Sequence, residues 1–197
     1  MLSSSLFIFV AVVSQDECFA RFSERAPRSG RVYFHRFDDV FSEVGAIRNV
    51  DPHLIKAVAW CETRLDPCSV SPAGARGLLQ FIPTTFADVA GAANASDAFV
   101  PEESVRAGGV YLAALLNHWR GEYVAVIASY NAGPEAVARA RRKGRIVPAI
   151  VETEEYVGCV LRALSDLGGA VPPPPPATVA PGLLGWLLGP LAGFSSP

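Results

Sequence analysis

Residues 51–83 read DPHLIKAVAWCETRLDPCSVSPAGARGLLQFIP, and the rest of the chain is interpreted outward from them. Asp51 is a suitable N-cap, and Pro52 suits the first helical position because its missing N–H would be unpaired there anyway. Leu54 and residues 57–61 make the segment apolar on almost every side, which is typical of a buried helix. The pattern therefore predicts a buried helix that begins at Pro52.

A single carboxylate, Glu62, ends this helix on the stripe formed by Ile55, Val58 and Ala59. Burial disfavours the charged form of a carboxylate, so we expect a raised pKa, as a general acid near neutral pH requires. A solvated Glu at a frayed helix end is the alternative, and the spacing alone leaves both interpretations open. Asp66 would lie on the same side of a bound sugar as Glu62, which is a poor geometry for a second catalytic acid. Asp66 is therefore expected to form a turn.

Two more polar motifs stand among apolar residues further along the chain. Residues 71–83 contain two glycines and place Gln80 between apolar neighbours. Glycine permits tight turns and a close approach of backbone to a ligand. Residues 128–134 read ASYNAGP at the end of a nearly all-apolar, buried segment, which would deliver Tyr130 and Asn131 to its end.

Together these motifs resemble those of lytic transglycosylases of the soluble, goose-lysozyme-related type. The family signature is a Glu followed by a hydroxyl residue, a Ser-Pro-x-Gly-Ala-x-Gly-Leu-x-Gln loop and a later Tyr-Asn-Ala-Gly. All three occur here in that order, with Thr63 in place of the usual Ser, and the resemblance covers residues 50–164. It implies an all-α, lysozyme-like single globular domain.

The resemblance also implies the chemistry. Glu62 would be the sole general acid and base at the β-1,4 bond between N-acetylmuramic acid and N-acetylglucosamine, assisted by the muramic N-acetyl group. The muramic C6 hydroxyl would close a 1,6-anhydro ring, a substrate-assisted exception to the two-carboxylate rule. No metal or organic cofactor is required. The residues expected to bind the saccharide, or for Asn131 to support Glu62 or its loop, are Ser71, Gln80, Ile82, Tyr130, Asn131 and Tyr156.

Other functions stay open at this point. A hydrolytic muramidase would use water for the final attack, and a non-catalytic wall-binding component of a secretion or conjugation apparatus would use only the fold. Each polar site residue also has a structural alternative, since a buried Tyr or Gln satisfies backbone groups. A basic cluster at residues 139–145 would meet peptidoglycan carboxylates or form a solvated face.

The composition limits the class of protein. The chain has 197 residues, 50% of them hydrophobic, which is enough for one well-buried domain. A formal net charge of −2 gives no reason to expect nucleic acid as a partner, and a monomer is expected. The sequence carries no metal-ligand cluster, phosphate-binding loop or dinucleotide fingerprint.

Residues 1–20 resemble a secretory signal, with apolar residues 6–13 before small residues at −3 and −1 of a cut after Ala20. Residues 1–5 carry no Lys or Arg, so an uncleaved segment and a misplaced start codon are alternatives. Export would place the protein in the periplasm or outside the cell. The expected domains are this signal, a transglycosylase domain over residues 21–170 and a tail over residues 171–197.

Export would leave Cys61, Cys68 and Cys159, an odd number in an oxidising compartment. Cys61 and Cys68 are the preferred disulfide pair. Within one helix they would lie roughly 10 Å apart, too far for a bond, so this pairing requires the chain to bend at Asp66. Three buried thiols are the alternative. The expected bridge would fix Glu62 from behind.

The C-terminal tail begins with five prolines at residues 172–176, a stiff spacer that marks a domain boundary. Apolar residues 182–194 would form about 20 Å of helix, against roughly 30 Å for the core of a bilayer. We therefore expect no membrane span. This segment would contact a membrane or a partner, or form a disordered tail.

Helical spacing predicts the remaining elements. We expect Thr153 to cap the last helix, and Gly108 and Gly109 to lie at a close helix crossing, which in the resembling family involves the catalytic helix. No strand-length run alternates convincingly. The further helices are expected over residues 31–48, from 84 or 85 to 89, from 101 onward, over 135–142 and over 154–167.

Overall fold

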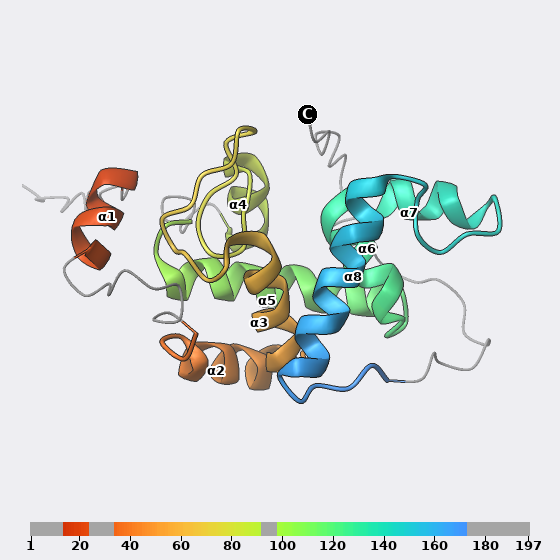
Figure 1. Ribbon diagram of the computed structural model, residues 1–197, viewed down its shortest axis with the longest axis horizontal. Helices are drawn as coiled ribbons and strands as arrows, with labels where there is room; N and C mark the ends of the chain where they lie inside the picture. The colour runs from red at the N-terminus through yellow and green to blue at the C-terminus, as the bar shows by residue number, and fades with distance from the viewer. Residues whose placement is uncertain (1–13, 24–33, 92–97, 173–197) are drawn as a thin grey trace, which may run out of the picture.

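A computed structural model of the protein describes residues 14–23, 34–91 and 98–172. Over these ranges the chain forms helices, turns and two isolated β-bridges, so the expected all-α class is confirmed (Figure 1). The helices are α1 (Gln15–Ser23), α2 (Asp38–Arg48), α3 (Pro52–Thr63), α4 (Pro83–Ala90), α5 (Pro101–His118), α6 (Tyr123–Ala132), α7 (Pro134–Arg141) and α8 (Val151–Asp166).

Helix α3 lies in the middle of the fold and contacts α2, α5 and α8 (Figure 1). Its residues from Leu54 to Ala59 are all buried. The Asp51 side chain accepts a hydrogen bond from the backbone N–H of His53 at 2.9 Å, which confirms the predicted N-cap. The buried helix that begins at Pro52 is therefore also confirmed.

One charged residue, Lys56, lies within the buried part of α3. Its Nζ is 2.5 Å from Oδ1 of Asp38 and 4.2 Å from the ring centroid of Phe34. A buried charge is tolerated only when it is paired in this way. The contact joins α2 to α3.

Two glycines bring α5 close to its neighbours. A Cβ on Gly109 would lie 2.3 Å from Cγ1 of Val44 in α2, and one on Gly108 would lie 2.1 Å from Cδ1 of Leu79. The predicted close approach is thus confirmed. The nearest neighbours of the two glycines are α2 and the loop after α3, although α5 also contacts α3.

Helix α8 begins differently from the prediction. Its N-cap is Ile150, and Thr153 lies inside the first turn. The Thr153 hydroxyl donates to Oδ1 of Asn131 at 2.7 Å instead of capping the helix. The predicted cap was therefore wrong, because this buried hydroxyl joins α8 to α6.

Helix α2 begins at Asp38, since residues 34–37 form a turn. Residues 31–33 of the expected helix lie outside the described ranges, as do residues 182–194 of the tail. Among the described helices, none is both long and apolar enough to cross a membrane.

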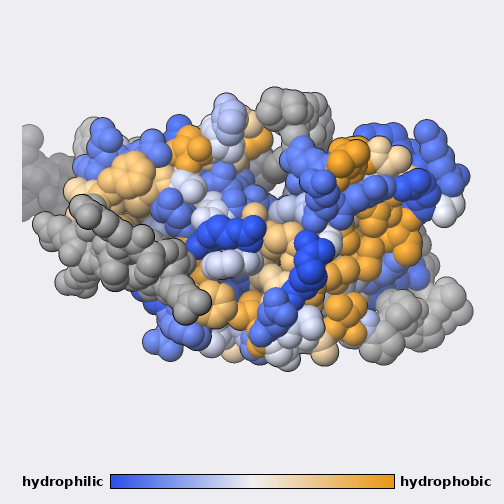
Figure 2. All heavy atoms as spheres, in the orientation of Figure 1, coloured by the Kyte–Doolittle hydropathy of each residue, from blue (hydrophilic) through white to orange (hydrophobic). Residues whose placement is uncertain are grey.

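The basic cluster after α6 is largely exposed. Arg141 pairs with Glu122 and lies over the ring of Trp119, and Arg145 pairs with Glu154 at 2.7 Å. Figure 2 shows hydrophilic residues gathered around the end of α7, with hydrophobic surface beside them. These pairs within the domain favour a solvated face over a binding site.

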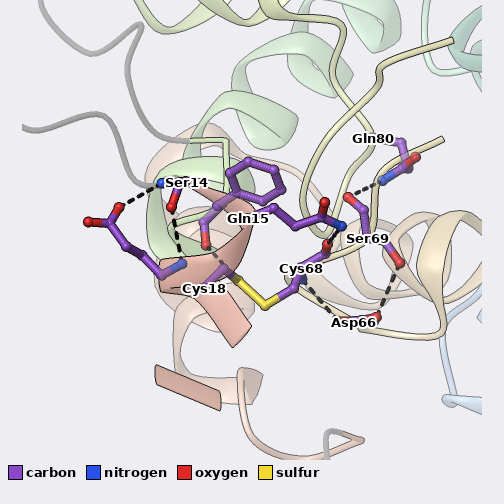
Figure 3. The surroundings of a disulfide bond; sticks show 9 residues. Ser14, Gln15, Cys18, Asp66, Cys68, Ser69 and Gln80 are labelled. Carbon is purple, nitrogen blue, oxygen red and sulfur yellow. Dashed lines mark hydrogen bonds between the residues drawn. A yellow bond between two sulfur atoms is a disulfide. The ribbon is translucent and has the colours of Figure 1, made fainter. Parts of the chain in front are cut away.

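Two disulfides contradict the predicted Cys61–Cys68 pair. Cys18 is bonded to Cys68 with Cα atoms 5.6 Å apart, and Cys61 is bonded to Cys159 with Cα atoms 6.1 Å apart. The expected turn at Asp66 is present, because its carboxylate accepts from Cys68 N–H at 2.9 Å. That turn directs Cys68 to α1 (Figure 3). Cys61 instead meets Cys159 on α8.

Helix α1 is attached to the loop after α3 (Figure 3). Besides the disulfide, Gln15 Nε2 donates to the carbonyl of Cys68 at 3.0 Å. A cut after Ala20 would fall inside α1 and detach Cys18 from the domain. A mature chain that begins after Ala20 would therefore lack the Cys18 partner of Cys68.

Replacing Cys18 and Cys68 together by Ala should lower the free energy of unfolding by about 2–4 kcal/mol, because the bond closes a long loop in the unfolded chain. Urea unfolding of the oxidised parent and of the double variant measures the difference. Equal urea midpoints would contradict the bond, and reductant should lower the midpoint of the parent more than that of the variant.

Candidate active site

Glu62 lies at the C-terminal end of α3, one residue before the last. Arg64 ends the helix in the left-handed region at φ 56°. The Thr63 hydroxyl lies 3.2 Å from the carbonyl oxygen of Ala59 and 3.1 Å from that of Leu78. The hydroxyl therefore ties the end of the helix to the following loop, and Glu62 is not at a frayed end.

The Glu62 carboxyl is protonated far more readily than an exposed one. Burial raises its pKa to about 7 from the ordinary 4.5, a hydrogen bond from Tyr156 opposes the rise, and the charge of Glu152 adds to it. The Tyr156 Oη donates to Glu62 Oε1 at 2.6 Å. Protein atoms crowd the carboxyl, yet the residue keeps part of its surface open to solvent. The predicted increase in pKa is confirmed.

Tyr156 comes from α8, whose inner face is anchored by buried Val157, Val160 and Leu164. Burial, and then the charge of Glu62, raise the pKa of the Tyr156 phenol well above its ordinary value. The phenol therefore stays protonated and donates to the carboxyl. Of the predicted saccharide-binding residues, Tyr156 is the one whose hydrogen bond reaches Glu62.

Tyr130 lies on α6 near Glu62 but hydrogen-bonds elsewhere. Its Oη donates to the carbonyl of Leu79 at 2.8 Å, and its ring packs against Tyr111 with centroids 5.4 Å apart. Burial raises the pKa of Tyr130 well above its ordinary value, with smaller contributions from Glu62 and Tyr111. The hydroxyl thus anchors the loop, which is the structural alternative raised for it.

Ser71 and Gln80 also hold the loop in shape. Gln80 Nε2 donates to the carbonyls of Ser69 at 3.2 Å and Gly77 at 3.0 Å. Ser71 Oγ accepts from the backbone N–H of Ala75 at 3.1 Å. These contacts support the structural alternative for both side chains.

Gly77 lets the loop pack against the segment before α5. It has φ 73°, and a Cβ there would lie 1.7 Å from the carbonyl oxygen of Ala98. The next turn is fixed by Leu79 N–H, which donates to the Ser104 hydroxyl at 3.2 Å. The loop that faces the end of α3 is therefore fixed by close backbone packing at Gly77 and by the Ser104 hydroxyl.

The described hydrogen bonds of Asn131 and Ile82 join them to residues other than Glu62. Asn131 accepts from Thr153, so its described hydrogen bond supports α8 rather than Glu62 or the loop. Ile82 is the N-cap of α4, and its carbonyl accepts from Phe86 N–H at 2.9 Å. Both residues are half-buried.

Glu152 is an acid near Glu62 that the sequence motifs did not single out. It is exposed in the first turn of α8, four residues before Tyr156, and its charge acts on Glu62. Its spacing to Tyr156 on one helix face was the available signal. Asp66, by contrast, is engaged in its turn by Cys68 and Ser69.

Within the described ranges, no group of three or more His, Cys, Asp or Glu side chains is placed to hold a metal ion.

A family model for the transglycosylase SLT domain matches residues 39–149. The chain belongs to this family. One relative is membrane-bound lytic murein transglycosylase F 1 of Alkalilimnicola ehrlichii, 31% identical over 129 residues, 62% of this chain and 24% of that protein. Membrane-bound lytic murein transglycosylase C of Yersinia pestis is 32% identical over 119 residues, 53% of this chain and 33% of that protein. The chain thus matches only a quarter to a third of these relatives.

Two solved structures share the fold. An inactive mutant of the lytic transglycosylase Slt from Pseudomonas aeruginosa has a TM-score of 0.61 at 21% identity, over 80% of this chain and 28% of that chain. The 70 kDa soluble lytic transglycosylase of Escherichia coli has a TM-score of 0.60 at 22% identity, over 78% and 26%. The predicted fold is confirmed, although the family match ends before α8 and Tyr156.

Changes at Tyr156 and Glu152 should move the pKa of Glu62 in opposite directions. Tyr156→Phe removes a donor that favours the carboxylate, so the pKa should rise. Glu152→Gln removes a negative charge, so the pKa should fall. A ¹³C NMR titration of the Glu62 carboxyl measures both. Glu155→Gln, which changes an exposed acid on the same helix, is the control. A shift of the Glu62 pKa in the same direction in Tyr156→Phe and Glu152→Gln would contradict the assignment.

Glu62→Gln should stabilise the protein at high pH. A carboxyl with a raised pKa contributes its full stability below 4.5 and loses it as the pH rises through about 7. The neutral amide escapes this loss, so its advantage should grow over that window, to on the order of 2–3 kcal/mol. Urea unfolding at a series of pH values measures it. A difference between Glu62→Gln and parent that does not vary with pH would show that Glu62 is not held protonated.

Proposed function

We propose that this protein is a peptidoglycan lytic transglycosylase that cleaves the β-1,4 bond between N-acetylmuramic acid and N-acetylglucosamine. The observation that carries the proposal is the Glu62 carboxyl, which has a pKa of about 7 and accepts a hydrogen bond from Tyr156. Membership of the transglycosylase SLT family and the names of the lytic murein transglycosylase relatives support it.

In the first step Glu62 acts as a general acid. Its proton moves to the glycosidic oxygen while the bond from that oxygen to the muramic C1 breaks, and the muramic N-acetyl oxygen bonds to C1. At pH 7 a carboxyl with a pKa of about 7 is protonated in roughly half of the molecules. Tyr156 then donates to the carboxylate that this transfer leaves behind.

In the second step Glu62 acts as a general base. Its carboxylate takes the proton of the muramic C6 hydroxyl as that oxygen bonds to C1 and displaces the N-acetyl oxygen. The product is a 1,6-anhydromuramic end, and Glu62 regains its proton. A pKa near neutrality suits both steps, because each form of the carboxyl is populated.

A hydrolytic muramidase is the second candidate, and Glu152 is the observation that favours it. Its charge acts on Glu62, so it is the second carboxylate considered for activating a water molecule. Its exposure in the first turn of α8 weakens this alternative, since a catalytic carboxylate is usually held by neighbours. A non-catalytic wall-binding component is disfavoured by the raised pKa of Glu62.

The proposed saccharide contacts use the polar side-chain atoms that hydrogen bonds within the protein leave available. Tyr156 touches Glu62, so it would border the reacting sugar. The amide nitrogen of Gln80 is engaged by backbone carbonyls, so a sugar contact would use its carbonyl oxygen. Tyr130 and Ser71 act chiefly by shaping the loop, and Asn131 by holding α8.

The two disulfides support an exported protein, because such bonds persist in oxidising compartments. We therefore keep the periplasm or the cell exterior as the proposed location. A secretory signal is compatible with the Cys18–Cys68 bond when the cut precedes Cys18. A secretion or conjugation apparatus as partner and a monomeric state remain predictions.

Glu62→Gln should lower the rate of peptidoglycan cleavage at least about 100-fold, the usual contribution of general acid–base catalysis. Release of soluble fragments from purified sacculi measures the rate, and Glu155→Gln is the control. Mass spectrometry of the parent's products should show muramic ends lighter by one water than hydrolysed ends. Hydrolysed ends would identify a muramidase, and full activity of Glu62→Gln would refute the catalytic role.

A further inference from the structure

The disulfide between Cys61 and Cys159 adjoins both partners of the central hydrogen bond. Cys61 directly precedes Glu62 on α3, and Cys159 follows Tyr156 by three residues on α8. Residues three apart on a helix share a face. The same two helices are therefore joined twice within about one turn, once by sulfur and once by the phenol–carboxyl contact.

The contact between Glu62 and Tyr156 depends strictly on the spacing of these helices. A hydrogen bond of 2.6 Å is lost if α8 withdraws by about 1 Å, since donor and acceptor would then exceed the normal range. Displacements of this size in catalytic groups cost up to about 100-fold in rate. A covalent link between Cys61 and Cys159 beside the contact would limit such a withdrawal.

Helix α8 is also held by packing against α3 and α6, with Val157 in the core. Thr153 binds Asn131 near the start of the helix, and Val160 and Leu164 pack into the core. On the outer side, Arg64 Nη1 lies 4.0 Å from Cys159 Sγ, and the Arg64 guanidinium lies over the ring of Trp60. Both cysteines are half-buried.

We propose that the Cys61–Cys159 disulfide is a positioning element of the active site that keeps the Tyr156 hydroxyl against the Glu62 carboxyl. This inference rests on the proposed function for the role of Glu62. The bond is not itself part of the chemistry. It acts through the separation of α3 and α8.

The second disulfide supplies a matched control. Cys18–Cys68 joins α1 to the loop after α3 (Figure 3). Neither of these cysteines is close in sequence to Tyr156 or directly adjacent to Glu62. Removing either bond deletes two cysteines and one link between distant segments. A general loss of stability should therefore appear in both variants, and a loss of positioning in one.

The experiment is a coupling measurement on the full chain. The titratable groups that act on Glu62 are Tyr156 and Glu152 from α8, and Tyr130 from α6 senses its charge. In the parent and in the Cys18→Ala, Cys68→Ala variant, adding Tyr156→Phe should raise the pKa of Glu62, read by ¹³C NMR. In the Cys61→Ala, Cys159→Ala variant the same change should have little effect, because the contact is already broken.

Kinetics supply the second measurement. On soluble peptidoglycan fragments, Cys61→Ala, Cys159→Ala should lower kcat at least ten-fold with KM nearly unchanged, whereas the control variant should keep both closer to the parent. Equal effects of Tyr156→Phe on the pKa of Glu62 in both cysteine backgrounds would overturn the inference. The NMR result stands apart from the proposed function, which fails separately if Glu62→Gln remains fully active.

A variant that does not fold leaves a direct alternative. The half-buried Cys61–Cys159 bond is more accessible than Cys18 and Cys68, which are 0% and 1% exposed. Mild reduction and alkylation of the folded parent, with the modified cysteines identified by peptide mapping, gives the same comparison. Retention of the Tyr156 effect after alkylation of Cys61 and Cys159 would also overturn the inference.

Discussion

A buried carboxyl must either have a hydrogen-bond partner or stay neutral, and both effects act on Glu62. Desolvation favours its protonated form, while the Tyr156 hydroxyl favours the ionised one. The balance lies at a pKa of about 7. A group in this balance gives up and regains a proton at little cost near neutral pH, which one residue needs if it is to act first as acid and then as base.

The rest of the domain keeps this pair in place. Helix α3 is fixed at its start by the Asp51 cap and along its length by the core. At its end the Thr63 hydroxyl reaches the loop, and Tyr130 holds the same loop through the carbonyl of Leu79. Several residues of the family motifs therefore shape the surroundings of Glu62.

The two disulfides stabilise different regions of the domain. Cys18–Cys68 holds α1 on the loop, and Cys61–Cys159 holds α8 beside α3. Helix α8 contributes residues to the main core, whereas the buried Cys18 of α1 lies in a smaller cluster, so the Cys18–Cys68 disulfide is a main attachment of α1. Both disulfides also agree with a protein that works outside the reducing cytoplasm.

Local signals in the chain were sufficient for the helical class, the start of α3, the turn at Asp66 and the raised pKa of Glu62. Each depends on side chains a few residues apart, or on an apolar pattern that burial makes unambiguous. The disulfide pairing, the role of Thr153 and the partner of Glu62 required the folded chain. They join residues separated by 50 and 98 positions for the disulfides and 94 for Glu62 and Tyr156, and spacing in sequence carries no information about which distant surfaces meet.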